Sequence, residues 1–356
     1  MFSKRVEKVR DLLKEKGIDS FLVTSPMNLT YLSGFECLSP TEREAYIFIT
    51  KKSTYIMTSP LYAEEVNAKD FSVELLSAKK PLSSAITSIL KKEALVTVGF
   101  EVDDLKFFEF DRLSKKDIPL VPSNLYNLRT LKDPSEIEKI AQACEIGDKA
   151  FSYILQVIKP GMTEEEVALE LELFIRKQHA TLSFPSIVAF GEGSAVPHHI
   201  TGKRTLQKNE FVLLDFGVKV NSYCSDMTRT VFVGKPSKDQ QRMYHTVKEA
   251  QDTSFEYVFH AKEIIAGEID QKARDYIISR GFADFPHCSH GIGLEVHEAP
   301  SLAPSAKEHI IEGMVFSVEP GIYFAGQAGV RIEDLIAIEP KGPRLLTKSS
   351  RELITI

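Results

Sequence analysis

The chain has 356 residues, 43% of them hydrophobic and 26% charged, which is typical of a globular protein and long for a single hydrophobic core. The net charge of −6 and the lack of a basic cluster in the sequence argue against a nucleic-acid partner. No apolar run approaches the roughly 18 residues that span a bilayer, and the first residues lack the apolar core of a signal peptide, so we expect no membrane partner.

The first part of the chain, residues 1–128, predicts a small α/β domain. A helix is expected from Phe2 to Lys16, because glycine, here Gly17, commonly follows the last turn of a helix. Strand-like and helix-like segments then alternate, which favours a mixed sheet flanked by helices. The strand-like runs are residues 20–24, 45–50, 53–57 and 94–100, and the helix-like segments are residues 60–69 and 103–113.

The second part, residues 129–356, predicts an α+β domain with a floor of antiparallel strands. Asp133 and Glu136 form a capping box with proline at the first helical position, and Thr163 with Glu166 forms another. A helix should therefore begin at each point. Strand-like runs dominate after about residue 180, and two helices, near 237–261 and 268–280, interrupt them.

Four acidic residues of this second part lie in apolar, strand-like surroundings. They are Asp215, Asp226, Glu319 and Glu333, and His290 lies in the glycine-containing run CSHGIGLEVHE. A buried carboxylate without a partner either costs several kcal/mol or takes up a proton. We therefore expect a compensating group near each acid.

The residues alone leave two explanations open. The acids could pair with buried arginines, for which Arg229 and Arg331 are the candidates. Alternatively, two divalent cations would neutralise the four carboxylates, since a neutral imidazole adds no charge. Carboxylate-rich ligation with one imidazole and no thiolate favours Mn²⁺, with Co²⁺, Fe²⁺ and Zn²⁺ as alternatives. Such a centre activates water for hydrolysis.

Four motifs in this part resemble the signature blocks of the Xaa-Pro metallopeptidases, the aminopeptidase P and prolidase family. They are LLDFGVKVNSYCSDMTRT, SHGIGLEVHE, MVFSVEPGIY and GVRIED. The resemblance runs from about Arg129 to the C-terminus and more loosely includes NLTYLSGF in the first domain. It implies a pita-bread catalytic domain over residues 129–356, preceded by a creatinase-like N-terminal α/β domain over residues 1–128.

The resemblance implies that five residues bind two metal ions. Asp215 would bind one metal, Asp226 and Glu333 would bridge both, and His290 and Glu319 would bind the second. The glutamate that matches Glu319 also acts as general base in the family, a role suited to a carboxylate beside an activated water.

Further residues match family positions outside the metal site. His198 in SAVPHH and His297 in LEVHE match histidines that contact the substrate, and Arg331 matches an arginine that supports the metal-binding acids. His199 and His287 match no motif, and we assign them no role.

The sequence departs from the family pattern at Ser222 and Ser289, where relatives usually have glycine, and neither change removes a ligand. The four cysteines are scattered and form no Cys-x-x-Cys pair, so we expect reduced thiols and a cytoplasmic protein. If the local strand is regular, Cys224 shares a face with Asp226. We hypothesise that oxidation of Cys224 or Cys288 inactivates the protein.

The activity implied by the resemblance is hydrolysis of the bond between an N-terminal residue and proline, by a water that two metal ions activate. Dipeptide-specific relatives commonly have an arginine shortly after the HE pair. Ser301 stands here, so longer peptides with proline second should also be accepted. A homodimer is implied as well. The alternatives are a metal-free creatinase-like hydrolase, a methionine aminopeptidase, which usually lacks the large N-terminal domain, and a non-enzymatic protein-binding module, which would lose ligands.

Overall fold

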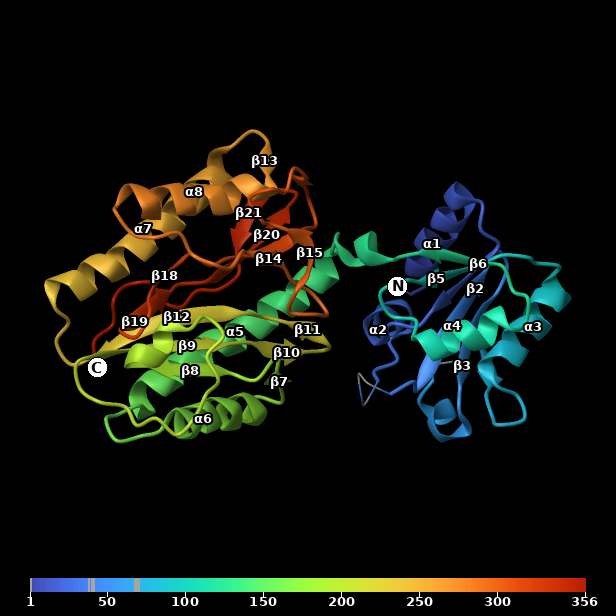
Figure 1. The fold of residues 1–356 in the computed structure, drawn as a ribbon, viewed down its shortest axis with the longest axis horizontal. Coiled ribbons are helices and arrows are strands. Elements are labelled where there is room, and N and C mark those ends of the chain that lie inside the picture. The colour runs from blue at the N-terminus through green and yellow to red at the C-terminus, as the bar shows by residue number, and fades with distance from the viewer. Residues whose placement is uncertain (1, 38, 40–41, 67–70) are drawn as a thin grey trace. The chain divides into compact units, whose positions relative to one another are not determined.

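The computed structural model describes residues 2–37, 39, 42–66 and 71–356. The chain divides into two compact units, residues 1–129 and 130–356, each of which is described by itself (Figure 1). The sequence analysis placed the seam one residue earlier. No helix within the described ranges is long and apolar enough to cross a membrane.

The N-terminal unit contains a six-stranded mixed sheet with the order β4-β3-β2-β1-β5-β6. Strand β1 runs antiparallel to β2 and parallel to β5, which confirms the predicted mixed sheet. The strands are β1 (Ser20–Val23), β2 (Ala45–Thr50), β3 (Thr54–Thr58), β4 (Ser72–Leu75), β5 (Val98–Glu101) and β6 (Leu120–Ser123). The helices are α1 (Phe2–Lys16), α2 (Pro26–Ser33), α3 (Leu82–Glu93) and α4 (Phe107–Ser114), with 3-10 turns η1 (Pro60–Glu65) and η2 (Tyr126–Arg129).

Several features of this unit differ from the sequence prediction, which also lacks helix α3 and strands β4 and β6. The helical pattern over residues 60–69 forms only the 3-10 helix η1, and residues 67–70 lie outside the described residues. Helix α2 was not predicted, although Ser25 caps its N-terminus and Gly34, with φ of 77°, ends it. Its eight residues are too few to show a clear helical period.

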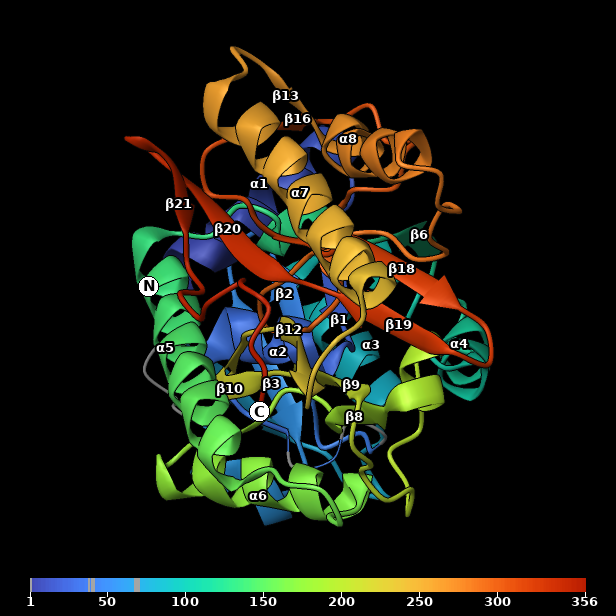
Figure 2. The same cartoon turned by 90° about the vertical axis from the view of Figure 1, so that its left-hand side faces the viewer.

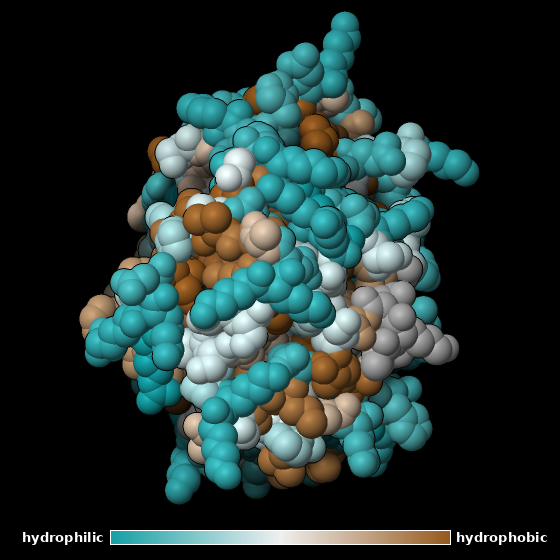
Figure 3. Space-filling view, turned by 90° about the vertical axis from the view of Figure 1, so that its right-hand side faces the viewer, coloured by the Kyte–Doolittle hydropathy of each residue, from teal (hydrophilic) through white to brown (hydrophobic). Residues whose placement is uncertain are grey.

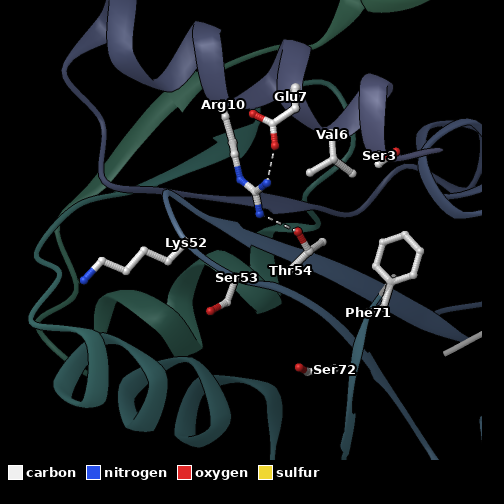
Figure 4. Close-up of a pocket in the computed structure, with 9 residues that line it drawn as sticks. All are labelled: Ser3, Val6, Glu7, Arg10, Lys52, Ser53, Thr54, Phe71 and Ser72. Atoms are coloured by element: carbon white, nitrogen blue, oxygen red, sulfur yellow. Dashed lines mark hydrogen bonds and ion pairs between the residues drawn. The ribbon is translucent and has the colours of Figure 1, made fainter. Parts of the chain in front are cut away.

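A surface hollow of about 410 Å³ lies beside α1 in the same unit (Figure 4). Arg10 extends into it, but donates to Glu7, to the hydroxyl of Thr54 and to the carbonyl of Thr50. Its guanidinium is therefore already engaged. The face in Figure 3 carries separate apolar patches among charged side chains. Among the described residues of the unit, the most exposed large apolar side chains are those of Leu61, Val96 and Phe107.

The C-terminal unit combines four helices with several small antiparallel sheets. The helices are α5 (Pro134–Val157), α6 (Glu164–Lys177), α7 (Lys238–His260) and α8 (Ala266–Ser279), with a 3-10 turn η3 (Gly191–Ala195). The first strands are β7 (Thr181–Leu182), β8 (Ile187–Phe190), β9 (Glu210–Phe216), β10 (Val218–Val220), β11 (Tyr223–Cys224), β12 (Met227–Val233) and β13 (Ile264–Ile265). The later strands are β14 (His290–Gly291), β15 (Glu298–Ser301), β16 (His309–Ile310), β17 (Val315–Val318), β18 (Gly321–Phe324), β19 (Ala328–Arg331), β20 (Asp334–Glu339) and β21 (Gly342–Leu345).

Helices pack against these sheets to form the core of the unit. Residues of α5 and α6 share one apolar cluster with β8, β9 and β12, while α7 and α8 share another with β18 and β19. Figure 2 shows α7 crossing in front of β18 and β19. Both predicted capping boxes, Asp133 with Glu136 and Thr163 with Glu166, are confirmed. The antiparallel pairs β9–β12 and β17–β20 confirm the predicted floor.

The segment from Asp215 to Asp226 does not form one continuous hairpin. Strand β9 pairs with β12, so that Asp215 faces Thr228, whereas β10 pairs with β11 in a separate sheet. Asp226 lies between β11 and β12 and belongs to neither strand. The prediction that Cys224 shares a regular strand face with Asp226 is therefore wrong. The turn before β11 places Ser222 at a φ of 69°, a conformation that the usual glycine adopts more easily.

Candidate metal centre

The five predicted ligands converge on one pocket of about 220 Å³ in the C-terminal unit. Asp215 is on β9, Asp226 precedes β12, and His290 begins β14. Glu319 follows β17, and Glu333 lies between β19 and β20. These segments are distant in sequence, and the antiparallel pairs β9–β12 and β17–β20 bring them together.

The side chains lie close enough to share ions. One ligand atom each from Asp226, His290 and Glu333 lies within 4.8 Å of the other two. Nε2 of His290 is 3.3 Å from Oε1 of Glu319 and 3.8 Å from Oδ2 of Asp226. An imidazole surrounded by carboxylates is a donor set that divalent transition metals accept.

Three of the carboxylates keep one oxygen free of hydrogen bonds. Oδ1 of Asp215, Oδ1 of Asp226 and Oε1 of Glu333 are buried and accept no hydrogen bond from the residues that the structure describes. The other oxygen of Asp215 contacts Arg331, and that of Glu333 accepts from Thr228 at 2.7 Å. Buried carboxylate oxygens without a donor require a cation or a proton. The residues present therefore fit a metal centre.

The electrostatics of the acids support the same conclusion. Burial, followed by the charge of Glu333, raises the pKa of Asp226 well above its usual value, and burial with the charge of Glu319 does the same for Glu333. Burial also acts on Glu319, but contact with His287 and the charge of His290 lower its pKa to about 2. Contacts within the chain thus favour the ionised form of Glu319, whereas the two other acids need additional positive charge.

Pairing with arginine accounts for only one of the four acids. Nη2 of Arg331 lies 2.5 Å from Oδ2 of Asp215. Arg229, the other candidate, pairs with Asp334, which lies outside the predicted set. Among the described residues that line the pocket, Arg331 is the only arginine or lysine. The cluster therefore retains a large negative charge that cations must balance.

Comparison with known proteins agrees with this geometry. The pattern of metallopeptidase family M24 matches residues 138–340, and that of the creatinase/prolidase N-terminal domain matches residues 5–125. The chain belongs to metallopeptidase family M24. The seam between the two matches, residues 125–138, contains the boundary between the two compact units.

Relatives of this M24 chain cover its full length. The uncharacterized peptidase YqhT of Bacillus subtilis (strain 168) is 36% identical over 99% of this chain and 100% of its own. The Xaa-Pro dipeptidase from Bacillus anthracis is 36% identical with a TM-score of 0.93, covering 100% of both chains. The X-Pro aminopeptidase from Thermotoga maritima MSB8 is 31% identical with a TM-score of 0.86, covering 96% of this chain and 98% of its own. The pita-bread fold predicted for the second domain is thereby confirmed.

The loop that carries His198 is held in this M24 unit by one buried carboxylate. Glu164, 1% exposed at the start of α6, accepts from the backbone N–H groups of Phe190 at 2.9 Å and Gly202 at 3.0 Å. Nε2 of His199 lies 2.9 Å from the same side chain. His199, to which the sequence analysis gave no role, therefore helps to anchor the loop. His198 is exposed and lines the pocket.

Two other histidines line the pocket. The ring centroids of His297 and His290 lie 4.1 Å apart, so the predicted substrate histidine lies beside one predicted metal ligand. His287, to which the sequence analysis gave no role, also lines the pocket. Its Nδ1 is 3.4 Å from Oε2 of Glu319, an ion-pair distance, and its Nε2 is 2.7 Å from the hydroxyl of Tyr323.

Tyr323 and His287 extend the network around the acids, and the sequence analysis missed both. The Tyr323 hydroxyl accepts from Nη1 of Arg331 at 2.9 Å, and Arg331 contacts Asp215. A chain of contacts thus joins Glu319 to Asp215 through the side chains of His287, Tyr323 and Arg331. For His287, the sequence offered one indication of a place near the site, because it lies three residues before His290 in the same irregular segment.

Proposed function

We propose that this protein is a metal-dependent peptidase that hydrolyses the peptide bond between an N-terminal residue and proline. The observation that carries the proposal is the pocket itself, in which buried carboxylate oxygens without hydrogen bonds converge beside His290. The bond type is suggested by two structural relatives, an Xaa-Pro dipeptidase and an X-Pro aminopeptidase.

The proposed metal ligands are Asp215, Asp226, His290, Glu319 and Glu333, which would hold two divalent ions. When bound, such ions polarise the substrate carbonyl and lower the pKa of a water molecule. We take Mn²⁺ as the first choice and Co²⁺, Fe²⁺ or Zn²⁺ as alternatives, because oxygen donors dominate the set.

The remaining site residues act on the substrate and on protons. Glu319, which is ionised at neutral pH, would accept a proton from the attacking water. His198 and His297 line the pocket and would donate hydrogen bonds to the oxygen on which negative charge develops. Arg331, 2.5 Å from Asp215, would keep that carboxylate ionised and correctly oriented.

The bond type matches what the pocket offers. An Xaa-Pro amide has no N–H, so an enzyme cannot recognise the scissile bond through that group, and attack on the carbonyl becomes the route. Phe184, Ile187 and Val296 give the pocket an apolar wall on which a proline ring can pack. Arg331, the one pocket guanidinium within the described residues, already contacts Asp215. We therefore propose that peptides longer than a dipeptide are accepted as well.

The proposal includes a homodimer in the cytoplasm. The four cysteines are free, which suits a reducing compartment. A non-enzymatic module is not favoured, because the chain retains all five proposed ligands and they line one pocket.

The decisive experiment compares cleavage of Ala-Pro, Ala-Pro-Ala and the proline-free Ala-Ala-Ala, with added Mn²⁺ and after chelation. We expect cleavage of both proline peptides, no cleavage of the control peptide, and loss of activity on chelation. Glu319→Gln should abolish cleavage, while Glu308→Gln, a change at an exposed glutamate, should not. Failure of the metal-loaded protein to cleave either proline peptide would refute the proposal.

A further inference from the structure

Helix α8 directs a buried ion pair toward the segment that precedes His290. Asp270 and Arg274 are 2% and 6% exposed, and Nη2 of Arg274 lies 2.9 Å from Oδ2 of Asp270. The other i,i+4 pair of the helix, Glu268 with Lys272, is 3.7 Å apart and nearly half exposed. Burial of a charge pair is tolerated only when further hydrogen bonds satisfy both groups, so the remaining contacts of Asp270 and Arg274 indicate what the pair holds.

The arginine of the pair holds the backbone ahead of the metal ligand. Nη1 of Arg274 donates to the carbonyl of Phe285 at 2.7 Å, and Nη2 donates to the carbonyl of His287 at 2.5 Å. Nη1 also contacts Asp284 at 2.7 Å, and the guanidinium lies 4.0 Å from the ring centroid of Phe285. One rigid side chain thus fixes the chain from residue 284 to residue 287.

The aspartate of the pair holds Ser289, the residue directly before His290. Oδ1 of Asp270 accepts from the hydroxyl of Ser289 at 2.8 Å and from its backbone N–H at 3.3 Å. The Ser289 hydroxyl in turn accepts from the backbone N–H of Glu319 at 3.3 Å. A hydroxyl can donate once and accept twice, so Ser289 joins α8 to the strand end that carries Glu319.

A second serine, Ser317, links the two proposed ligands His290 and Glu319. Ser317 Oγ accepts from the backbone N–H of His290 at 3.0 Å and donates to Oε1 of Glu319 at 2.9 Å. The residues on either side of the His290–Glu319 contact are therefore tied to each other and, through Ser289, to α8. A glycine at position 289 would offer no hydroxyl for this link.

We propose that Asp270, Arg274 and Ser289 form a positioning unit that sets the separation of His290 and Glu319, and that metal affinity depends on the Ser289 hydroxyl. None of these three residues lines the pocket. This inference rests on the metal site of the proposed function. It adds to that function a group of residues outside the predicted ligand set.

The test measures metal binding directly. Mn²⁺ is titrated by calorimetry into chelator-treated protein, for the parent and for Ser289→Ala, Asp270→Asn and the double variant. Because partners that orient metal ligands typically contribute about 10–100-fold in affinity, we expect a loss of this size for each single variant. The double variant should bind Mn²⁺ no more weakly than the weaker-binding single variant, since both changes break the same chain of hydrogen bonds. Lys272→Gln, on the same helix, should bind as the parent does.

The melting temperature of each metal-free variant separates positioning from folding. A Ser289→Ala protein with unchanged Mn²⁺ affinity, whether or not it is less heat-stable, would overturn the proposal. If Asp270→Asn does not fold, Ser289→Ala decides alone, because it removes no charge and no ligand. A parent protein that binds no Mn²⁺ would refute the proposed function and this inference together. Tight binding by the parent with an unaltered Ser289→Ala would refute this inference only.

Discussion

The buried guanidinium of Arg229 offers a quantitative test of how the floor of the site is stabilised. Arg229 is 1% exposed and pairs with Asp334 at 2.5 Å, and both side chains are almost completely buried. It donates further to the carbonyls of Thr228 and Glu333 and to those of residues 349 and 350. Arg229→Met removes the cation and five hydrogen bonds without a large change in volume.

The expected cost follows from the burial of the charge that remains. Breaking a buried ion pair by removing one partner typically costs about 3–5 kcal/mol, because the other charge is left in a medium of low polarity. For a domain of about 150–250 residues, each kcal/mol lowers the melting temperature by about 2–4 °C, so a fall of about 6–20 °C is expected. The C-terminal unit, residues 130–356, lies in this size range.

Calorimetry and circular dichroism are the suitable assays, because the chain contains no tryptophan for fluorescence. Arg344→Met is the matched control. Arg344 pairs with Glu339 at 3.0 Å but is 40% exposed, and exposed pairs contribute about 0–1 kcal/mol. A fall of less than 4 °C for the Arg229 variant, or one no larger than that of the control, would refute the reasoning.

Three other predictions follow from the site. Chelation should abolish cleavage of Ala-Pro and lower the melting temperature, because the buried acids lose their counter-charge, and Mn²⁺ should restore both. Glu164→Gln should raise KM about 5–30-fold with a smaller effect on kcat, since a buried carboxylate that accepts three hydrogen bonds holds the loop of His198 and each such bond contributes about 1 kcal/mol or more. Native protein should react slowly with Ellman's reagent at Cys224, because burial raises its pKa to about 11, and burial also raises the pKa of Cys288.

A specific result would contradict each of these three predictions. Chelation that leaves the melting temperature unchanged would mean that no metal neutralises the acids. A Glu164→Gln protein with unchanged KM would show that the loop is held elsewhere, and Glu165→Gln, one residue along on the same helix, serves as its comparison. Rapid labelling of Cys224 before unfolding would revive the oxidation hypothesis, which the raised pKa values of both thiols do not favour.

The sequence predicted features that depend on neighbours in the chain. Capping boxes such as Asp133 with Glu136 are local, so residue types a few positions apart define them. The acids were conspicuous for a similar reason, since a carboxylate inside an apolar run is unusual whatever the fold. The structure places all five predicted ligands at one pocket.

Features that depend on distant packing could not be predicted. His287 contacts Tyr323, 36 residues away, and nothing near it in the sequence marks that contact. The chain breaks between β11 and β12, so Asp226 belongs to neither strand. At this break the hydroxyl of Ser225 donates to the carbonyl of Val218. The link from Asp270 to Glu319 crosses three segments, so only the assembled fold shows it.

The contacts of Arg331 with Asp215 and Pro197 have a thermodynamic consequence. One nitrogen of its guanidinium contacts Asp215, while another donates to the carbonyl of Pro197, directly before His198. An ion at Asp215 and a peptide against the loop would therefore share a single rigid group. Linkage is reciprocal, so whatever factor metal loading adds to peptide affinity, peptide must add to metal affinity. A peptidase built in this way would retain its metal most firmly while it has substrate bound.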